Sequence, residues 1–318
     1  MPLIPVAYLG HAAGLATSVL WTGTSMLFTA AGRRLGATVV NTMRILIAVA
    51  LQCVTHRLVT GAWIPAANGR QILLLAGSGL LGLAIGDQAL LTAFVEIGPR
   101  VSLLIMTTAP LFAALFGWIM LGETLTPVAL VGITLTTAGV AWVVLERPTA
   151  ATGTTGGRRA RGILLAFVGA ICQAAGLLLS KAGIGHGWLP EDQYLKPQAA
   201  SFVRTFFAAL GVLPILAAYA LRERGRRAAG IYPVRIGSRW TGALCAFGGS
   251  LVGPYLGVWM SLEAAHRVSL GVAQTLCSLP PVFILPFARF IHHERISARA
   301  VIGALVAVGG VAMLLVLR

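Results

Sequence analysis

The sequence predicts an all-α polytopic membrane protein whose ten transmembrane helices form an inverted five-plus-five repeat. Three observations lead to this prediction. Hydrophobic residues make up 57% of the 318 residues and charged residues only 10%, with a mean hydropathy of +0.86. Apolar runs of spanning length follow one another along the chain, and parts of the first half recur in the second. So few charges cannot cover a globule with polar surface, and lipid is therefore the expected solvent.

Ten apolar segments are each close to the length that a helix needs to cross the hydrocarbon core. They run roughly over 6–30, 37–60, 71–95, 101–121, 127–145, 161–184, 197–221, 240–262, 268–291 and 297–316. Helices are required because the bilayer interior offers no water to free backbone groups. The expected location is the inner or plasma membrane, as a multi-pass protein.

An internal repeat divides the chain. The stretch 96–103 (EIGPRVSL) recurs at 263–270 (EAAHRVSL), an offset of 167 residues. At a second offset of 171 residues the matches are Pro110 with Pro281, Glu123 with Glu294, Gly132 with Gly303, and Gly139 with Gly310. Five spans are an odd number, so the two halves must enter the membrane in opposite directions, as in many secondary transporters. The predicted repeats are 1–147 and 162–318, joined by a linker at 148–161.

The end of each half resembles a known family. The stretch 108–126 (TAPLFAALFGWIMLGETLT), with 131–132 and 138–140 after it, resembles the end of an EamA domain, and 280–311 is similar but more diverged. The chain thus resembles the drug/metabolite transporter superfamily, whose members have two EamA repeats and ten spans. The resemblance implies a secondary carrier, typically an exporter of amino acids, other metabolites or drugs. It also implies a cavity framed by the first, third and fourth helices of each repeat.

Three of the charged residues inside predicted spans are candidates for a functional role. Asp87 is a carboxylate in the middle of the third segment, where an unpaired charge costs several kcal/mol. It is expected to carry a proton, to bind a substrate amine, or to pair with Arg44 or Arg204. These two arginines occupy matching places in the second segments. Each is expected either to anchor its helix at the interface or to bind an anionic group.

Prolines and hydrogen-bonding or aromatic side chains complete the set of residues expected to bind substrate or couple transport. A proline within a helix bends it and frees a carbonyl, which in transporters often lines the cavity; the alternative is a packing kink. For each polar or aromatic residue, packing is likewise the alternative to a cavity role. The residues are Trp21, Gln88, Thr107, Thr108, Pro110, Gln173, Tyr255, Trp259, Gln274 and Pro281.

Six further charged residues are candidates for structural or gating roles: Glu96, Arg100, Glu263, Arg267, Glu123 and Glu294. The first four form two pairs whose members are four residues apart, a spacing that suits an ion pair at a helix end. The last two stand at the start of the fifth segments, where a carboxylate meets the positive end of the helix dipole and is expected to cap it.

The net charge and the absence of known motifs exclude several classes of function. The formal net charge of +15 is expected to come from loop arginines that fix orientation, not from a nucleic-acid surface. No nucleotide-binding GxxxxGK[ST] loop, metal motif or catalytic constellation occurs, so we expect no cofactor, no metal and no enzyme activity. The expected partners are a small-molecule substrate, the lipid bilayer and a coupling proton, with a homodimer left open. The hypothesis is export of a small polar metabolite by alternating access. The alternatives are a membrane scaffold that binds without transporting, and an intramembrane enzyme.

Two arguments give opposite predictions for the orientation of the chain in the membrane. Alternate connections hold 16 Lys and Arg residues on one side and six on the other. The positive-inside rule therefore places both termini outside the cytoplasm, whereas members of the family more often have cytoplasmic termini. We lean to the charge count.

Overall fold

The structure is a computed structural model that describes residues 8–146, 156–228, 237–283 and 298–316. These residues are helical apart from turns and short connections and contain no strand, which confirms the all-α class for the described part of the chain. Six helical stretches are long and apolar enough to cross a membrane, and three more are apolar but shorter. The ten-span count therefore stays a prediction.

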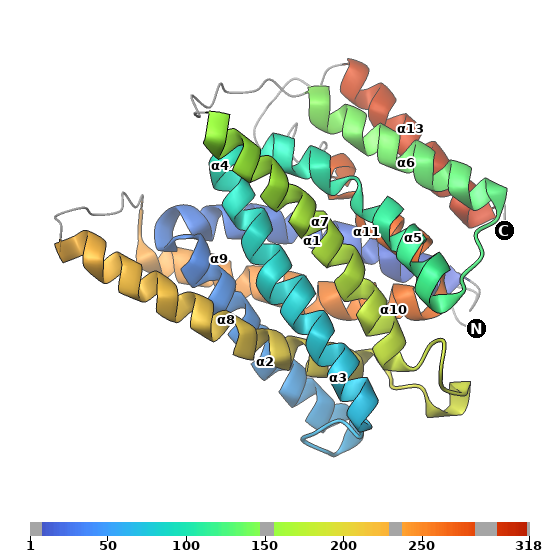
Figure 1. Cartoon of the computed structure of the whole chain (residues 1–318), viewed down its shortest axis with the longest axis horizontal. Helices are drawn as coiled ribbons and strands as arrows, with labels where there is room; N and C mark the ends of the chain where they lie inside the picture. The colour runs from blue at the N-terminus through green and yellow to red at the C-terminus, as the bar shows by residue number, and fades with distance from the viewer. Residues whose placement is uncertain (1–7, 147–155, 229–236, 284–297, 317–318) are drawn as a thin grey trace.

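Figure 1 shows the arrangement of the helices, of which η2 and η4 are π-helical and η3 is a 3-10 turn. The elements are α1 (Leu9–Leu35), α2 (Ala37–Thr60), α3 (Gly69–Ser78), η2 (Gly79–Gly86), α4 (Asp87–Met106), α5 (Ala109–Leu121), α6 (Pro127–Glu146), α7 (Gly156–Ile184), η3 (Glu191–Gln193), α8 (Pro197–Ala228), α9 (Arg239–Ser250), η4 (Leu251–Gly257), α10 (Val258–Arg267), α11 (Leu270–Cys277) and α13 (Ala298–Val316). α7 begins inside the segment that the sequence assigned to the linker.

The third segment of each half is one long helix with a π-helical stretch in its middle. In the first half, α3, η2 and α4 continue without a break to Met106, although the sequence predicted a break near 96–100. The chain turns instead at Thr107 and Thr108, whose hydroxyls donate to the carbonyls of the preceding turn at 2.6 and 2.7 Å. Pro110 lies in the first turn of α5, where its missing N–H costs nothing. It starts a helix and does not bend one.

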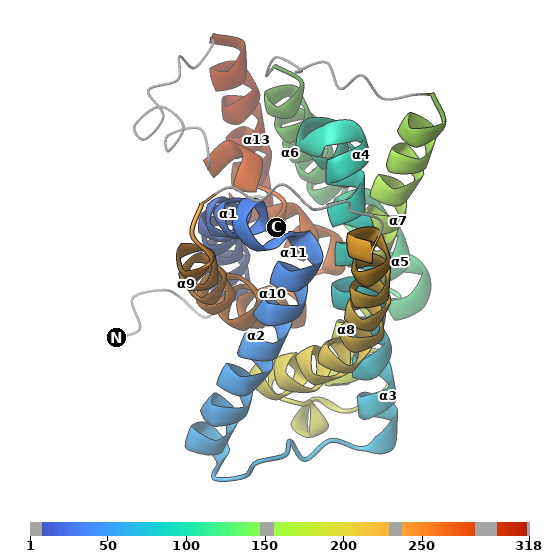
Figure 2. The same ribbon diagram turned by 90° about the vertical axis from the view of Figure 1, so that its left-hand side faces the viewer.

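The helices of the two halves interlock. α1 packs against α9 and α10, whereas α7 packs against α3, η2 and α4. Figure 2 shows the first group on one side of the molecule and the second group, with α8, on the other. Each third segment thus packs on the first helix of the opposite half. Glycines allow this approach: a Cβ atom on Gly253 would lie only 2.7 Å from Thr24 Oγ1 of α1, and one on Gly86 2.8 Å from Cys172 Cβ of α7.

The fifth segments of the two halves, α6 and α13, lie side by side at the edge of the molecule (Figure 1). Their backbones are in contact, since a Cβ atom on Gly139 would lie 2.6 Å from the carbonyl oxygen of Gly303. Thr136 of α6 also reaches across, with its hydroxyl 3.4 Å from the Ala307 carbonyl. The glycines that match at the offset of 171 residues are therefore the residues that let the two copies touch.

Candidate functional site

A cavity of about 150 Å³ lies between the two groups of helices. It is lined by Trp21 and Thr24 of α1, Arg44 and Ile45 of α2, Leu83 of η2, Asp87 of α4, Gln173 and Leu177 of α7, Arg204 of α8, Gly253 and Pro254 of η4, Val258 and Ser261 of α10, and Gln274 of α11. Both second helices contribute an arginine. We call this space the central cavity.

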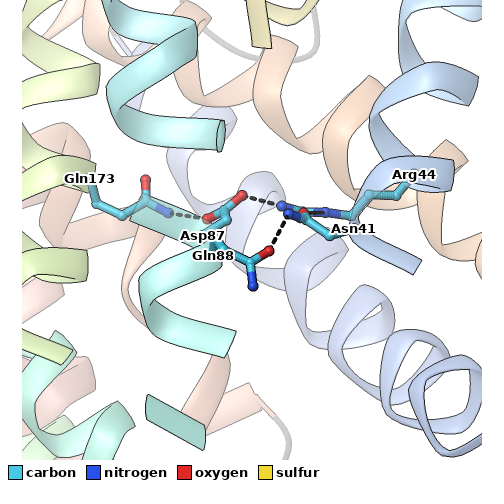
Figure 3. A network of polar contacts seen from close by, with 5 residues as sticks. All are labelled: Asn41, Arg44, Asp87, Gln88 and Gln173. Carbon is cyan, nitrogen blue, oxygen red and sulfur yellow. Dashed lines mark hydrogen bonds and ion pairs between the residues drawn. The ribbon is translucent and has the colours of Figure 1, made fainter. Parts of the chain in front are cut away.

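Asp87 and Arg44 form an ion pair at the wall of the central cavity. Asp87 is the first residue after the π-helical stretch η2 and is only 8% exposed. Figure 3 shows its second contact, from the Gln173 side-chain amide to Asp87 Oδ1 at 3.3 Å. Asn41 holds the arginine by accepting from its Nε at 2.8 Å, and it also donates to Gln88 at 3.4 Å. The Asp87 carboxylate is therefore paired on both oxygens, as a charge at this depth requires.

Arg204 is the second cation of the central cavity, and it differs from Arg44 in having no ion-pair partner among the described residues. It is 3% exposed, and its Nε atom is buried without a hydrogen bond. The guanidinium occupies a notch made by two glycines. A Cβ atom on Gly82 would lie 2.8 Å from Arg204 Nη2, and one on Gly176 would lie 3.4 Å from it. Asp87 acts on this charge electrostatically but is already bonded to Arg44.

The structure brings part of the predicted site together. Six of the residues expected at the substrate site line the central cavity, namely Trp21, Arg44, Asp87, Gln173, Arg204 and Gln274, and Gln88 joins them through Asn41. The residues that do not line it are Thr107, Thr108, Pro110, Tyr255, Trp259 and Pro281.

The residues outside the cavity have packing contacts of their own. The Tyr255 hydroxyl lies 2.6 Å from the Thr55 hydroxyl of α2. The Trp259 ring is near the Tyr255 ring, with centroids 6.5 Å apart. Pro281 follows a break at the end of α11, as Pro110 follows the turn after α4.

Three polar residues of the site were missed from the sequence. Thr24 and Ser261 line the central cavity, and Asn41 orients Arg44. The sequence could have predicted the role of Asn41, because it precedes Arg44 by three residues and residues at this spacing are neighbours on a helix. Thr24 and Ser261 had none, since isolated hydroxyl residues are common in apolar helices and usually bond to their own backbone, as Ser261 does here at 2.8 Å.

A second ion pair, between Lys181 and Glu123, lies one helical turn along α7 from the wall of the central cavity. Lys181 of α7 lies 2.5 Å from Glu123 and donates to the Val268 carbonyl at 2.6 Å. Glu123 also accepts from the Leu270 backbone N–H at 2.7 Å. Lys181 is one turn beyond Leu177, which lines the central cavity. We call Glu123, Lys181, Val268 and Leu270 the gate cluster.

The gate cluster corrects two sequence-based interpretations. Glu123 was expected to cap its own helix, the fifth segment, but it caps α11 of the other half. It can do so because Gly122 ends α5 with φ of +65°, a left-handed conformation that glycine adopts without strain, and so reverses the chain. Lys181 was counted as a loop cation in the orientation argument, yet it is 6% exposed within a helix and has a carboxylate partner.

Val268 of the gate cluster also lines a wider cavity of about 660 Å³, which we call the vestibule. It is lined by residues that include His11, Glu191, Tyr194, His186 and His266. His186 and His266 ring nitrogens are 3.0 Å apart, and the His186 ring packs on Tyr194 with centroids 4.5 Å apart. His186 lies just after the end of α7. Burial lowers the pKa of His186 from 6.5 to about 4, helped by the nearby charges of Lys181 and His266.

One of the two predicted helix-end pairs is seen among the described residues. Glu263 and Arg267 form the expected i,i+4 ion pair at 2.5 Å. Glu96 lies 3.3 Å from Arg161 of α7. Arg100 is in helix α4, but its side chain is outside the described part of the structure, and Glu294 lies outside the described residues altogether.

The central cavity offers ion pairing and hydrogen bonding to a small solute at the interface of two interlocked repeats. Among the residues that the structure describes, no group of three or more His, Cys, Asp or Glu side chains is placed to hold a metal ion. Buried charges that face a cavity between two repeats of membrane-spanning helices are typical of membrane transporters. The fold and the site together define that class.

Comparison with known proteins agrees with the class and gives the family. The family model of the EamA-like transporter family matches residues 8–145 and 160–316, so the chain belongs to this family, whose members are transporters and not enzymes. A solved structure described only as "Crystal structure of protein" is 19% identical, with a TM-score of 0.74 over 97% of this chain and 96% of that one. At this identity the likeness shows the fold alone. No curated protein matches the chain.

Proposed function

We propose that the chain is a secondary carrier that exports a small metabolite by alternating access, with the solute bound in the central cavity. The observation that supports this most directly is that one repeated sequence adopts two conformations. The motif at 96–103 lies wholly within helix α4, which runs to Met106. Its copy at 263–270 is broken: α10 ends at Arg267, Val268 is extended with φ of −127° and ψ of 168°, and α11 starts at Leu270.

Two conformations of one motif are what alternating access between inverted repeats requires. In such carriers the two halves exchange conformations, and the closed end of the pathway moves from one face to the other. The proposal is that the first motif breaks as the second straightens. The free energies of the two arrangements must then be close, because the same eight-residue pattern supports both.

The gate cluster supports the broken conformation of the second motif. Straightening α10 into α11 would return the Val268 carbonyl and the Leu270 N–H to a helical ladder. Lys181 and Glu123 occupy these two groups in the present arrangement. Release of the Lys181–Glu123 pair is therefore the proposed step that opens the route from the central cavity to the vestibule.

Proton coupling is part of the proposal and would act through Asp87. The Asp87 carboxylate, when ionised, holds Arg44. A proton on this carboxylate would remove the ion pair and free the guanidinium for a solute. The helical, multi-pass character of the chain fits an inner or plasma membrane, and a homodimer is compatible with the carrier mechanism without being required by it.

Thiol accessibility tests the carrier without knowledge of its substrate. Thr24→Cys would be made in a background that lacks Cys53, Cys172, Cys245 and Cys277, and oriented membrane vesicles would be treated with a membrane-impermeant thiol reagent from either face. Thr24 lines the central cavity, so alternating access predicts modification from both faces in turn. The matched control is Thr124→Cys in the vestibule, for which modification from one face is expected.

The alternatives predict other patterns. A non-transporting scaffold would leave the Thr24→Cys thiol open to one face only, or to neither. An intramembrane enzyme would give one-sided access as well, since its substrate enters and its product leaves without a switch of faces. One-sided labelling of Thr24→Cys under all conditions would therefore overturn the carrier proposal.

A further inference from the structure

The charges that line the central cavity do not balance. Arg44, Arg204 and Asp87 are the charged residues among those that line it, two cations and one anion. Arg44 is satisfied by Asp87 and Asn41. Arg204 is 3% exposed, and its positive charge has no ion-pair partner among the residues that the structure describes. A buried charge without a partner is unfavourable, and a site that contains one is completed by a ligand of the opposite sign.

The notch around Arg204 is shaped for its guanidinium. Gly82 and Gly176 bring the backbones of η2 and α7 close to the side chain, and any larger residue at Gly82 would place its Cβ 2.8 Å from Arg204 Nη2. The planar guanidinium offers paired N–H groups that match the two oxygens of a carboxylate. Its Nε is buried and has no hydrogen-bond partner within the described part of the chain, so the hydrogen bonding of the group is incomplete.

The size and the wall of the central cavity limit the ligand further. A cavity of about 150 Å³ in another protein holds one benzene molecule, so about six non-hydrogen atoms fit here. Besides its charged groups and the polar side chains of Thr24, Gln173, Ser261 and Gln274, the wall presents apolar side chains, chiefly Trp21, Leu83 and Val258. The ligand that fits the net charge, the volume and the apolar part of the lining of the central cavity is a small anion with a short apolar body.

We infer that the carrier's substrate class is the small organic monoanions, bound with the carboxylate on Arg204 and the apolar body against Trp21. This inference rests on the proposed function and adds its substrate class. A bound ligand with one negative charge brings the net charge of the central cavity from plus one to zero. A cation would raise it to plus two, and a zwitterion would leave it at plus one, so both are expected to bind less well.

Four compounds with related carbon skeletons test the charge preference directly. Butyrate, butyramide, butylamine and 2-aminobutyrate are an anion, a neutral amide, a cation and a zwitterion. Thermal stabilisation and calorimetric binding would be measured on the purified full chain at constant chloride, with a separate chloride titration. Butyrate is expected to bind and stabilise most, because a ligand of the native state raises its apparent stability. Equal effects of butyrate and butyramide would overturn the inference.

Variants of Arg204 locate the effect. Arg204→Gln is expected to weaken butyrate binding by at least about tenfold, the loss typical of removing a charge-assisted hydrogen bond. The same variant is expected to raise the melting temperature of the empty protein, since it removes an unpaired buried charge. Arg204→Lys keeps the charge without the paired N–H groups and should retain part of the binding. The matched control Arg57→Gln, at an exposed arginine of α2, should bind butyrate as the native chain does.

The other outcomes count against the inference. Stabilisation by 2-aminobutyrate alone would assign a zwitterion, and stabilisation by butylamine alone would assign a cation. An equal shift with chloride alone would mean that Arg204 holds only an inorganic ion. Failure of all four compounds, combined with two-sided labelling of Thr24→Cys, would reject the substrate class and leave the carrier intact. One-sided labelling would reject the carrier itself.

Discussion

Replacement of Asp87 by Asn tests the charge arrangement of the central cavity. The change keeps the size of the side chain and removes the one negative charge that holds Arg44 and acts on Arg204. Breaking a buried ion pair costs about 3–5 kcal/mol in soluble proteins, because the remaining charge stays buried. The Asp87 and Arg44 side chains are 11% and 15% exposed, so the lower end, about 3 kcal/mol, is expected. Transport should be lost while the protein remains folded.

The assay is denaturant unfolding in detergent micelles, followed by tryptophan fluorescence, with size-exclusion chromatography as the check of folding. Adding Arg44→Gln to the Asp87→Asn variant removes the charge left behind, and the double variant should regain about 2 kcal/mol. The control is Glu263→Gln, which breaks a more exposed i,i+4 pair and should cost only about 0.3–0.5 kcal/mol. If Asp87→Asn costs no more than this control, the buried pair does not have the role that its geometry gives it.

Three further predictions follow from other parts of the molecule. Gly139→Ala should destabilise the protein by about 1–3 kcal/mol, because the new Cβ would meet the backbone of α13. The control Gly157→Ala should not destabilise it, because the space around Gly157 is open. Denaturant unfolding measures both changes. Lys181→Met leaves the gate cluster without its cation, so the thiol in the central cavity should label faster from the vestibule face; an unchanged rate would contradict the gate. The pKa of His186 is lowered to about 4, so the unfolded chain gains the proton near pH 6.5 and the folded chain only near 4. Stability should therefore be present above pH 6.5 and decline as the pH falls toward 4, and His186→Asn should weaken that decline.

Much of the fold was readable because lipid imposes a simple rule on the chain. Every span must be apolar and helical, so hydropathy alone located helices α2, α6 and α13 to within a residue or two. The rule does not locate the turns between successive helices, because it says nothing about where one helix ends and the next begins. The turn at Thr107 and Thr108 was placed too early, near 96–100, because Pro99 and nearby charged residues resemble a loop in sequence. The π-helical stretches η2 and η4 were also not predicted.

The sequence predicted which residues belong to the candidate site but not which of them contact one another. Asp87, Arg44 and Arg204 stood out because charges inside apolar segments are rare. Their pairing did not follow, because Asp87 had two arginines as alternatives. Tyr255 and Trp259 looked equally suited to a cavity, yet they pack beside it, since a helix rotated by a fraction of a turn presents a different face.

The sequence by itself determined that the protein lies in the membrane, that it is helical, and that it consists of two related halves; the opposite direction of these halves stays a prediction. These properties depend on composition and on order along the chain. Only the tertiary structure decided that Asp87 binds Arg44, that Arg204 has no ion-pair partner within the described ranges, and that Glu123 pairs with Lys181 of the other half. The physical reason is that a buried charge needs a partner of opposite sign but does not specify which one. Helix depth and rotation make that choice, and they are set by packing between segments far apart in the chain.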